Sequence, residues 1–446
     1  RKRNLQDRYQ LNAKEAATAM RDGEITSVEL VGSCLQRIDE LEARVEAWAH
    51  LDPDYALEQA SAADDRRRAG QALGALHGIP VGIKDIFDTN DMPTENGSPL
   101  YSGRRPYRDA TVVSQLRQAG AVIMGKTVST ELAVYSPGNT TNPHDQARTP
   151  GGSSSGSAAA VAAQMVPLAV GSQTNGSIIR PASYCGICGF KPSHGLISRH
   201  RVLALSRRLD HVGVFARNLE DTALLAEQLM VFDAEDPDMR PQVRPALCST
   251  LAEEPPLPPR FAFVEGPGWD QVEADTREGL AELVSVLGDR VFACELPEIF
   301  HQAVDWHRII MEADLALSFE REYRHGREKL SAVLCEILER GQGYTAVDYN
   351  RARTGITLLN QELGKLFGEY DAIITPAVTG EAPLGLASTG SPVCCTLWSL
   401  CGVPSLSLPL LQGSNGMPIG VQLVAARGDD ARLLRTARWL TKAVAA

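Results

Sequence analysis

Short apolar runs alternate with helical segments along this chain, and this alternation limits the possible folds more than any other feature. "GIPVGIKDIF" (78–87) follows a Gly/Pro turn, and "AVIMGK" (121–126) is a second run of β type. Between them, "DATVVSQLRQAG" (109–120) has the spacing of a helix that ends at Gly120. "MVPLAVGSQT" (165–174), "FAFVEG" (261–266), "DAIITPAV" (371–378), "PSLSLPLL" (404–411) and "PIGVQLVAA" (418–426) continue the pattern. The alternation predicts an α/β fold with a mixed, largely parallel sheet core, covered by helices on both faces.

Length and local composition indicate one domain over residues 1–446. Thr26 and Glu29 form a capping box ahead of a helical pattern, so we expect N-terminal helices over 1–70. The core follows over 71–232, and a C-terminal part, 261–446, completes the sheet. The segment 233–260 between them is rich in proline and acid. It fits a surface excursion or a linker, and the strand signals on both sides favour the excursion.

Composition bounds the class of protein. Of the 446 residues, 43% are hydrophobic and 22% charged, which is typical of a soluble globular chain. The net charge of −11 argues against a nucleic-acid surface, because phosphate binding needs a concentrated basic face. No secretory segment and no apolar run of membrane-spanning length is visible. We therefore expect a cytoplasmic protein with no membrane partner.

Nine cysteines, an odd number, indicate free thiols in a reducing compartment. Cys185 and Cys188 form a C-x-x-C, which fits a redox pair, half a zinc site or core packing, and the lack of a second such pair favours packing. The chain has neither H-E-x-x-H nor a P-loop, so we expect no metal and no organic cofactor.

The stretch from Pro150 to Gly186 concentrates serine and glycine. A flexible linker, a phosphate-binding loop and a nucleophile elbow are three interpretations of such a run. The Ala-rich helix that follows disfavours a linker. The missing lysine disfavours a phosphate-binding loop, and the loose match to G-x-S-x-G disfavours a nucleophile elbow. A nucleophilic serine needs a base, which is usually histidine but can be a neutral, buried lysine. Lys84, between Ile83 and Ile86 on an interior run, is a candidate; the plainer interpretation is an exposed strand lysine.

The same stretch resembles the amidase signature family. "GGSSSGSAAAVAA" and "PLAVGSQTNGSIIRPASYCGICGFKPSHG" match its core, "HGIPVGIKDIF" matches its lysine segment, and "SPVCCTLWSLCGVPSLSLPLL" matches its C-terminal part. The resemblance runs from about Ala13 to the end. It implies a Ser–cisSer–Lys triad that cleaves amides through an acyl-enzyme, with Ser177 as nucleophile, Ser153 as bridging serine after a cis Gly152–Ser153 peptide, and Lys84 as base. It also implies an oxyanion hole made by the backbone N–H groups of Thr174, Asn175, Gly176 and Ser177.

The sequence departs from the family pattern Asp-x-Gly-Gly-Ser-x-Arg at three places. Gln173 replaces the Asp, Asn175 replaces the first Gly, and the Arg comes one residue later, as Arg180. Because the acid is lost and the Arg displaced together, we expect a neutral hydrogen bond in place of an ion pair. Ser154, Ser155 and Ser157 are expected to bond locally and start the next helix.

The loops "TENGSPLYSGRRPY", "ELAVYSPGNTTNPHD" and "SPVCCTLWSLCG" are expected to form the rim of the pocket, with Tyr135, Leu397 and Trp398 as apolar walls or as ordinary packed residues. These features predict a free-standing amidase for small aryl or apolar linear amides, with activity on esters and on carbamates (urethanase). The predicted partners are these small molecules and no nucleic acid; homodimers are common in the family. Two alternatives stay open: an A-subunit-like component of a tRNA-dependent amidotransferase, and an inactive binding protein on the same fold.

Overall fold

A single mixed sheet forms the centre of the molecule. The computed structural model describes residues 5–445. The sheet has 11 strands in the order β1-β3-β2-β4-β6-β5-β10-β11-β9-β7-β8. The strands are β1 (Trp48–Leu51), β2 (Pro80–Lys84), β3 (Val122–Thr127), β4 (Leu168–Gln173), β5 (Cys188–Lys191), β6 (His211–Ala216), β7 (Phe261–Phe263), β8 (Val291–Ala293), β9 (Ala372–Pro376), β10 (Ser405–Gln412) and β11 (Pro418–Val424).

The predicted α/β class with a mixed sheet is confirmed, but the parallel share is smaller than expected. The parallel pairs lie towards the two ends of the sheet: β3 with β2, β2 with β4, β9 with β7 and β7 with β8. The strands from β4 through β6, β5, β10 and β11 to β9 pair antiparallel. At β10 and β11 the reason is the short turn 413–417 between them, because strands joined by so few residues can only pair antiparallel.

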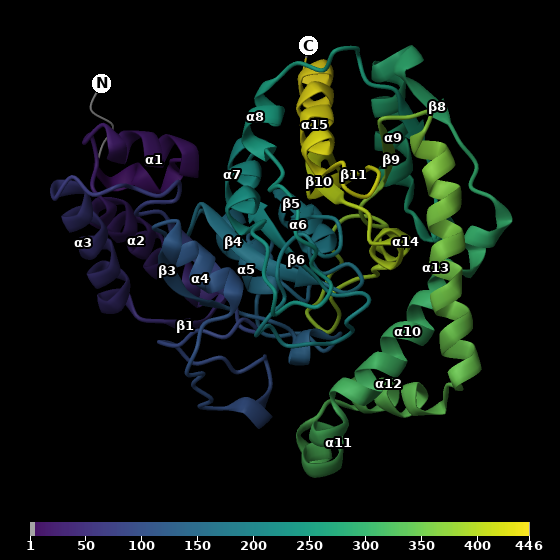
Figure 1. Cartoon of the computed structure of the whole chain (residues 1–446), viewed down its shortest axis with the longest axis horizontal. Helices are drawn as coiled ribbons and strands as arrows, with labels where there is room; N and C mark the ends of the chain where they lie inside the picture. Colours follow the sequence, from purple (N-terminus) through teal and green to yellow (C-terminus); the bar gives the residue numbers. More distant parts are fainter. Residues whose placement is uncertain (1–4, 446) are drawn as a thin grey trace.

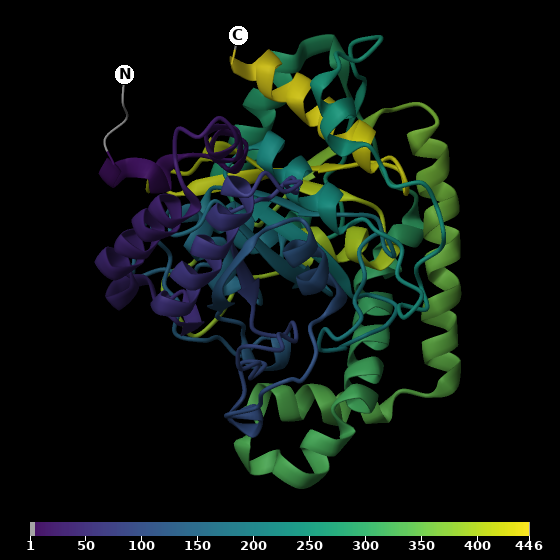
Figure 2. The same cartoon turned by 60° about the vertical axis from the view of Figure 1, so that its left-hand side comes forward.

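Helices cover both faces of this sheet (Figure 1 and Figure 2). One layer contains α5 and α6, which contact each other and the central strands; the other contains α4 and α7, with α8 and α15 packed beside α7. A helical arm of α10 to α13 extends along one side (Figure 1). The helices are α1 (Ala13–Arg21), α2 (Ser27–Val45), α3 (Pro53–Arg68), α4 (Thr111–Gln118), α5 (Ser155–Ala162), α6 (Ile179–Cys185), α7 (Leu219–Leu229), α8 (Leu247–Ala252), α9 (Ala274–Leu287), α10 (Ala303–Ser318), α11 (Glu320–Gly326), α12 (Ala332–Gly343), α13 (Ala346–Phe367), α14 (Val393–Cys401) and α15 (Asp430–Ala445).

Local sequence signals account for several of these elements. The capping box of Thr26 and Glu29 begins α2, as predicted. The Pro-rich segment 233–260 contains the helix α8, which packs between α7 and α15. The main hydrophobic core extends from Leu11 to Leu440. This continuous core supports the prediction of one domain, which stays a prediction.

The fold brings three chain segments to one edge of the sheet. Lys84 is the last residue of β2, and β4, parallel to β2, ends at Gln173. The chain leaves β4 through the loop 174–178 and enters α6, while α5 starts just after Ser153. Because the carboxyl ends of parallel neighbours meet at one edge, Lys84 and the two serine segments converge there.

The cysteines and the helices bear on two further expectations. All nine cysteines are free, and Cys185 and Cys188 are buried in the core, as expected from packing. Within residues 5–445, no helix combines the length and the apolar character needed to cross a membrane.

Candidate active site

Lys84 is enclosed at the end of β2, with no exposed surface. Its Nζ lies 2.6 Å from the Ser153 hydroxyl and 2.8 Å from the Ser172 hydroxyl. Burial holds the pKa of Lys84 well below its usual value, and the negative charge of Asp210 acts in the opposite direction. A lysine with a lowered pKa can accept a proton, so this group is placed to take one from Ser153.

Ser153 follows a cis peptide bond with Gly152, as the resemblance implies. The serines after it behave differently from the expectation. Ser155 does bond locally, to the Gly151 carbonyl at 2.9 Å, but Ser154 and Ser157 donate to carbonyls of β4, to Ser172 and Val170. Ser154 and Ser155 stand at the start of α5 as expected, but the expectation of local bonding was wrong for Ser154 and Ser157. These two hydroxyls fasten the start of α5 to the strand that leads to the candidate nucleophile.

Ser177 lies in the loop between β4 and α6, and it is 8% exposed. Within residues 5–445 its hydroxyl makes no hydrogen bond to Ser153. Catalytic hydrogen bonds are often long before substrate binds, so this geometry is compatible with a relay that closes on the substrate.

The loop before Ser177 is held by side chains that sequence reasoning missed. The Thr174 carbonyl accepts a hydrogen bond from His307 at 2.9 Å, and the Thr174 hydroxyl donates to Asp210 at 2.7 Å. Burial lowers the pKa of His307 to about 4, so its ring is neutral near pH 7. His307 comes from α10, 133 residues from its partner, and no local motif surrounds it.

Asn175 is held through its backbone carbonyl and through both ends of its side-chain amide. Its carbonyl accepts from Ser399, its side-chain oxygen accepts from Thr396 at 2.7 Å, and its amide donates to the Tyr135 hydroxyl at 3.0 Å. Thr396 and Ser399 lie on α14. The replacement of a family glycine by Asn175 therefore adds anchors to the loop and leaves its backbone N–H groups in place.

Two cavities flank this centre. The cavity beside Asn175 has a volume of about 250 Å³ and is lined by Tyr135, Asn175, His307, Met311 and Thr396, among others. Tyr135 is one of these lining residues, and its role in binding substrate stays a prediction. Leu397 and Trp398 do not line this cavity; each is 1% exposed and packs in the hydrophobic core, because the face of α14 that meets the cavity carries Val393 and Thr396. Their expected role as pocket walls is corrected accordingly.

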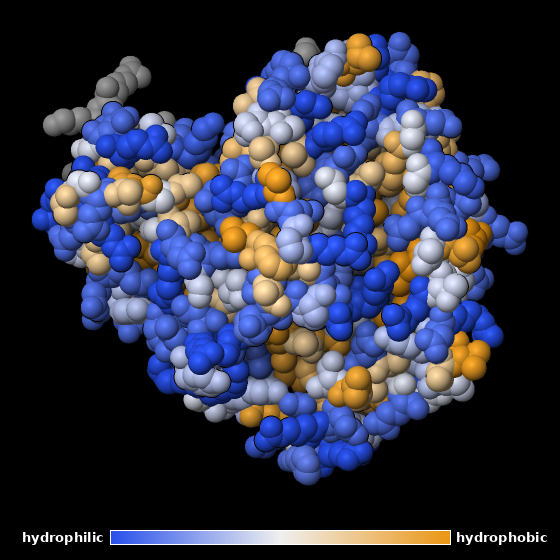
Figure 3. All heavy atoms as spheres, viewed as in Figure 1, coloured by the Kyte–Doolittle hydropathy of each residue, from blue (hydrophilic) through white to orange (hydrophobic). Residues whose placement is uncertain are grey.

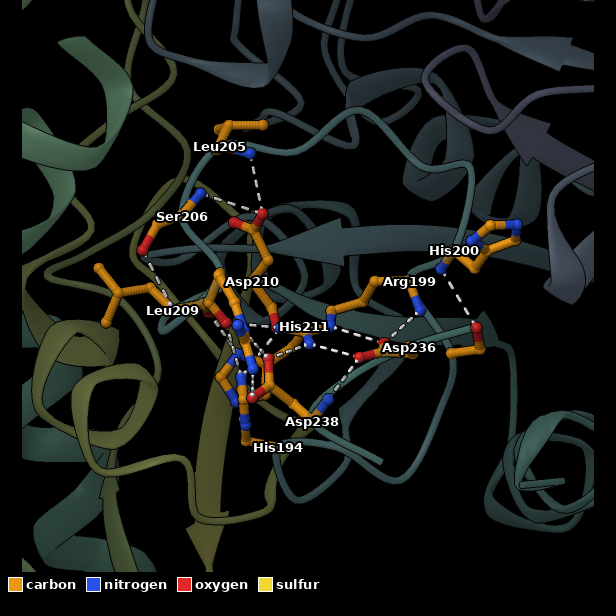
Figure 4. A network of polar contacts seen from close by, with 12 residues as sticks. His194, Arg199, His200, Leu205, Ser206, Leu209, Asp210, His211, Asp236 and Asp238 are labelled. Carbon is orange, nitrogen blue, oxygen red and sulfur yellow. Dashed lines mark hydrogen bonds and ion pairs between the residues drawn. The ribbon is translucent and has the colours of Figure 1, made fainter. Parts of the chain in front are cut away.

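The second cavity, of about 340 Å³, lies beside Ser172, Thr174 and Asp210. Figure 4 shows Asp210 accepting the backbone N–H groups of Leu205 and Ser206, at 2.9 and 3.1 Å. Enclosure raises the pKa of Asp210 to about 6, which these hydrogen bonds partly oppose. Asp210 is therefore mostly ionised near pH 7, and its negative charge raises the pKa of Lys84.

The surroundings of this cavity are polar and charge-balanced. Arg199 pairs with Asp236 and Asp238 (Figure 4).

The molecular face in Figure 3 is largely hydrophilic, with hydrophobic residues gathered in a hollow near the α11–α12 end. Among the described residues, no group of three or more His, Cys, Asp or Glu side chains is placed to hold a metal.

Gln173 and Arg180 are not hydrogen-bonded to each other, so the expected exchange of their ion pair for a neutral hydrogen bond was wrong. Gln173 accepts from the N–H groups of Ile178 and Ile179, at 2.8 and 3.0 Å, and donates to Ser399 at 2.9 Å. Arg180 donates instead to the Gly152 carbonyl at 2.8 Å and to Thr389 at 3.1 Å. Each side chain has its own partners because the shift by one residue turns Arg180 towards the peptide before Ser153.

Comparisons with known proteins agree on the family. The family model described as Amidase matches residues 29–434. The A subunit of the glutamyl-tRNA(Gln) amidotransferase of Chloroflexus aggregans is 38% identical over 96% of this chain and 95% of its own length. The protein of the same name from Streptomyces coelicolor is 32% identical over 97% of this chain and 95% of its own length.

Two solved structures extend the agreement to the fold. The peptide amidase of Stenotrophomonas maltophilia superposes with a TM-score of 0.85 and 28% identity, covering 98% of this chain and 97% of its own. A protein from a vestigial complex that reveals the evolutionary origins of an s-triazine catabolic enzyme superposes with a TM-score of 0.91 and 26% identity, covering 97% and 98%.

These relatives contradict two predictions made from the sequence. Curated relatives at 32–38% identity carry the name of one component of an amidotransferase, against the predicted free-standing hydrolase of aryl or apolar amides, esters and carbamates. The same name contradicts the prediction of small-molecule partners only and no nucleic acid. The net charge misled because a sum over the whole sequence does not tell where the charges lie. With a family model matched over nearly its whole length, the chain belongs to the amidase family, the amidase signature enzymes that act on carbon–nitrogen bonds.

Proposed function

We propose that this protein hydrolyses a carboxamide and releases ammonia, as the A-subunit-like component of a tRNA-dependent amidotransferase. The observation that carries the chemistry is the buried pair of Lys84 and Ser153, 2.6 Å apart, beside the loop that presents Ser177. The assembly is supported by the relatives named as the A subunit of glutamyl-tRNA(Gln) amidotransferase, which this chain matches along almost their full length.

The reaction proceeds in two halves. Ser177 Oγ attacks the carboxamide carbon while Ser153 takes its proton and passes its own to Lys84. The negative charge on the carbonyl oxygen is stabilised by backbone N–H groups of residues 174–177. The C–N bond then breaks, the relay returns the proton to the nitrogen, and ammonia leaves an acyl ester on Ser177. Water, deprotonated by the same relay, hydrolyses this ester to a carboxylic acid and restores Ser177.

The proposal includes other components of the assembly, one of which receives the ammonia and uses it on the tRNA. An inactive binding protein would not require a buried lysine beside a bridging serine, and the described chain retains both.

The test replaces the A subunit of the Chloroflexus aggregans enzyme with this chain and supplies L-glutamine and glutamyl-tRNA. We expect ammonia release from glutamine and glutamine-dependent amidation of the tRNA, both lost in Ser177→Ala. Association with the other subunits is measured first, by co-purification. If the chain neither associates with them nor releases ammonia from glutamine, while the native A subunit does both, the proposal is wrong.

A further inference from the structure

Five arginines from four distant parts of the chain form a connected feature on the surface, which we call the arginine stripe. Its members are Arg108, Arg201, Arg208, Arg240 and Arg427. Within residues 5–445 none of them makes an ion pair with a carboxylate. Arg108, Arg240 and Arg427 are exposed, and the other two are half-buried. The stripe therefore presents positive charge that the protein itself does not neutralise.

One end of the stripe surrounds Tyr107, which is 79% exposed. The centroid of its ring lies 5.6 Å from the guanidinium carbon of Arg108 and 5.5 Å from that of Arg201. Arg201 has a φ of 61°, in the left-handed region that favours glycine, so a long side chain is unfavourable for the backbone at this position. The stability of the fold therefore does not account for an arginine here.

The middle of the stripe borders the cavity of about 340 Å³ described above. Arg201 lines this cavity together with Arg199 and Arg207, and those two arginines are paired with Asp236 and Asp238. The pairs balance the charges of Arg199 and Arg207 only. Because these carboxylates are already engaged, they do not compensate the charge of the stripe.

The other end of the stripe gathers Arg208, Arg240 and Arg427. Arg427 Nη2 donates to the His194 carbonyl at 3.0 Å, and His194 Nε2 lies 3.0 Å from Arg199 Nη1, which connects this end to the cavity (Figure 4 shows His194 beside Arg199). Burial lowers the pKa of Arg427, and the positive charges of Arg208 and Arg240 lower it further. These three guanidinium groups repel one another, so a bound anion is favoured between them.

The kind of ligand follows from the charge and from the aromatic ring. A guanidinium group offers paired N–H donors that match the oxygens of a phosphate. Cations beside an exposed aromatic side chain are the combination that holds single-stranded nucleic acid, with the backbone on the cations and a base on the ring. Glu235, an exposed acid that lines the cavity, offsets one charge of the stripe, so the local excess stays positive although the whole chain carries −11.

We propose that the arginine stripe binds the phosphate backbone of an RNA and that an unpaired base of this RNA stacks on Tyr107. The RNA is the tRNA of the proposed function, on which this identification rests. Since the cavity beside the stripe also contacts Ser172, the bound RNA lies next to the candidate active site. A free phosphate or a mononucleotide shares the chemistry but covers only part of the stripe, so both serve as competitors in the test.

The salt dependence of tRNA binding tests the proposal. Fluorescence anisotropy follows a labelled tRNA(Gln) transcript with the full chain, and we expect a Kd of about 1–100 µM near 150 mM salt. Each phosphate contact contributes about 0.7–0.9 to the slope of log K against log salt concentration. Replacing Arg208, Arg240 and Arg427 together by glutamine should therefore reduce that slope by about 2–3.

Two further variants complete the test. The matched control removes three exposed arginines that make no ion pair within residues 5–445 and lie on α2, α3 and α11: Arg44, Arg66 and Arg321, each replaced by glutamine. It changes the net charge equally and should leave the slope as in wild type. Tyr107→Ala should weaken binding about 5- to 100-fold through the lost stacking but keep the slope.

Each other outcome overturns a defined part of the proposal. Equal slopes in the two triple variants, or no tRNA binding by wild type at about 100 µM, overturns the stripe as an RNA surface. Displacement of the tRNA by AMP or inorganic phosphate at equal phosphate concentration makes it a site for small anions and also overturns it. Unchanged affinity in Tyr107→Ala overturns the stacking. If the triple variant does not fold, Arg240→Gln alone decides, with an expected reduction of the slope by about 0.7–0.9. Ammonia release from glutamine is measured separately, and its absence in the assembly contradicts the proposed function instead.

Discussion

Replacing Gln173 by alanine should destabilise the loop that carries Ser177. The Gln173 side chain accepts hydrogen bonds from the N–H groups of Ile178 and Ile179, and all three residues are fully buried. Alanine leaves both N–H groups without an acceptor, at a cost of about 1–3 kcal/mol each. The lost bond to Ser399 adds little, because the Ser399 hydroxyl still donates to Asn175. We therefore expect a loss of about 2–6 kcal/mol in the free energy of unfolding.

Urea unfolding followed by circular dichroism measures this loss, and hydrogen exchange locates it at residues 178 and 179. Gln412→Ala is the matched control, because Gln412 is exposed and its side chain makes one hydrogen bond, to Gly416. That variant should stay within about 0.5 kcal/mol of wild type. Equal midpoints for the two variants, with unchanged exchange at 178 and 179, would refute the reasoning.

Three further predictions concern the nucleophile and two charged or titratable neighbours. Ser177→Ala should lose turnover and fluorophosphonate labelling but keep the wild-type unfolding midpoint; labelling of another serine in the variant would contradict the assignment. Asp210→Asn should shift the basic limb of the kcat/KM profile to lower pH, because the ionised Asp210 raises the pKa of Lys84 and its loss lets Lys84 deprotonate earlier; an unmoved limb in Asp210→Asn would count against the coupling. For His307, burial lowers the pKa from 6.5 to about 4. Its neutral ring therefore contributes about 3 kcal/mol to the free energy of unfolding above pH 6.5, and this contribution is lost as the pH falls towards 4. The free energy of unfolding should fall more steeply across this range in wild type than in His307→Gln, and parallel slopes would exclude this contribution.

Local signals in the sequence predicted much of the architecture. Hydrophobic periodicity and turn residues located β2, β3, β4 and the capped start of α2, because these signals depend on residues a few positions apart. The direction of the central strands was not predictable in this way, since it depends on how distant segments pair. The antiparallel centre of the sheet therefore differs from the largely parallel sheet expected.

Part of the candidate site was likewise predictable from the sequence, and part was not. The family resemblance picked out Ser153, Ser177 and Lys84, and the structure brings Lys84 and Ser153 to 2.6 Å. The resemblance also led to the wrong substrate and partners, because the signature encodes the hydrolytic chemistry and not the assembly in which it operates. The curated relatives corrected both.

The order of strands and helices along the chain, and the residue types available for acyl transfer, follow from the amino-acid sequence alone. The distant side chains that hold the loop before Ser177 became known only from the folded molecule: His307 lies 133 residues from its partner, and Ser399 lies 224 residues from Asn175. The same is true of Arg180, whose hydrogen bonds to the Gly152 carbonyl and to Thr389 join residues 28 and 209 positions away. Contacts across such separations leave no local pattern, since they are selected by packing around a core that forms only when the entire sheet is assembled.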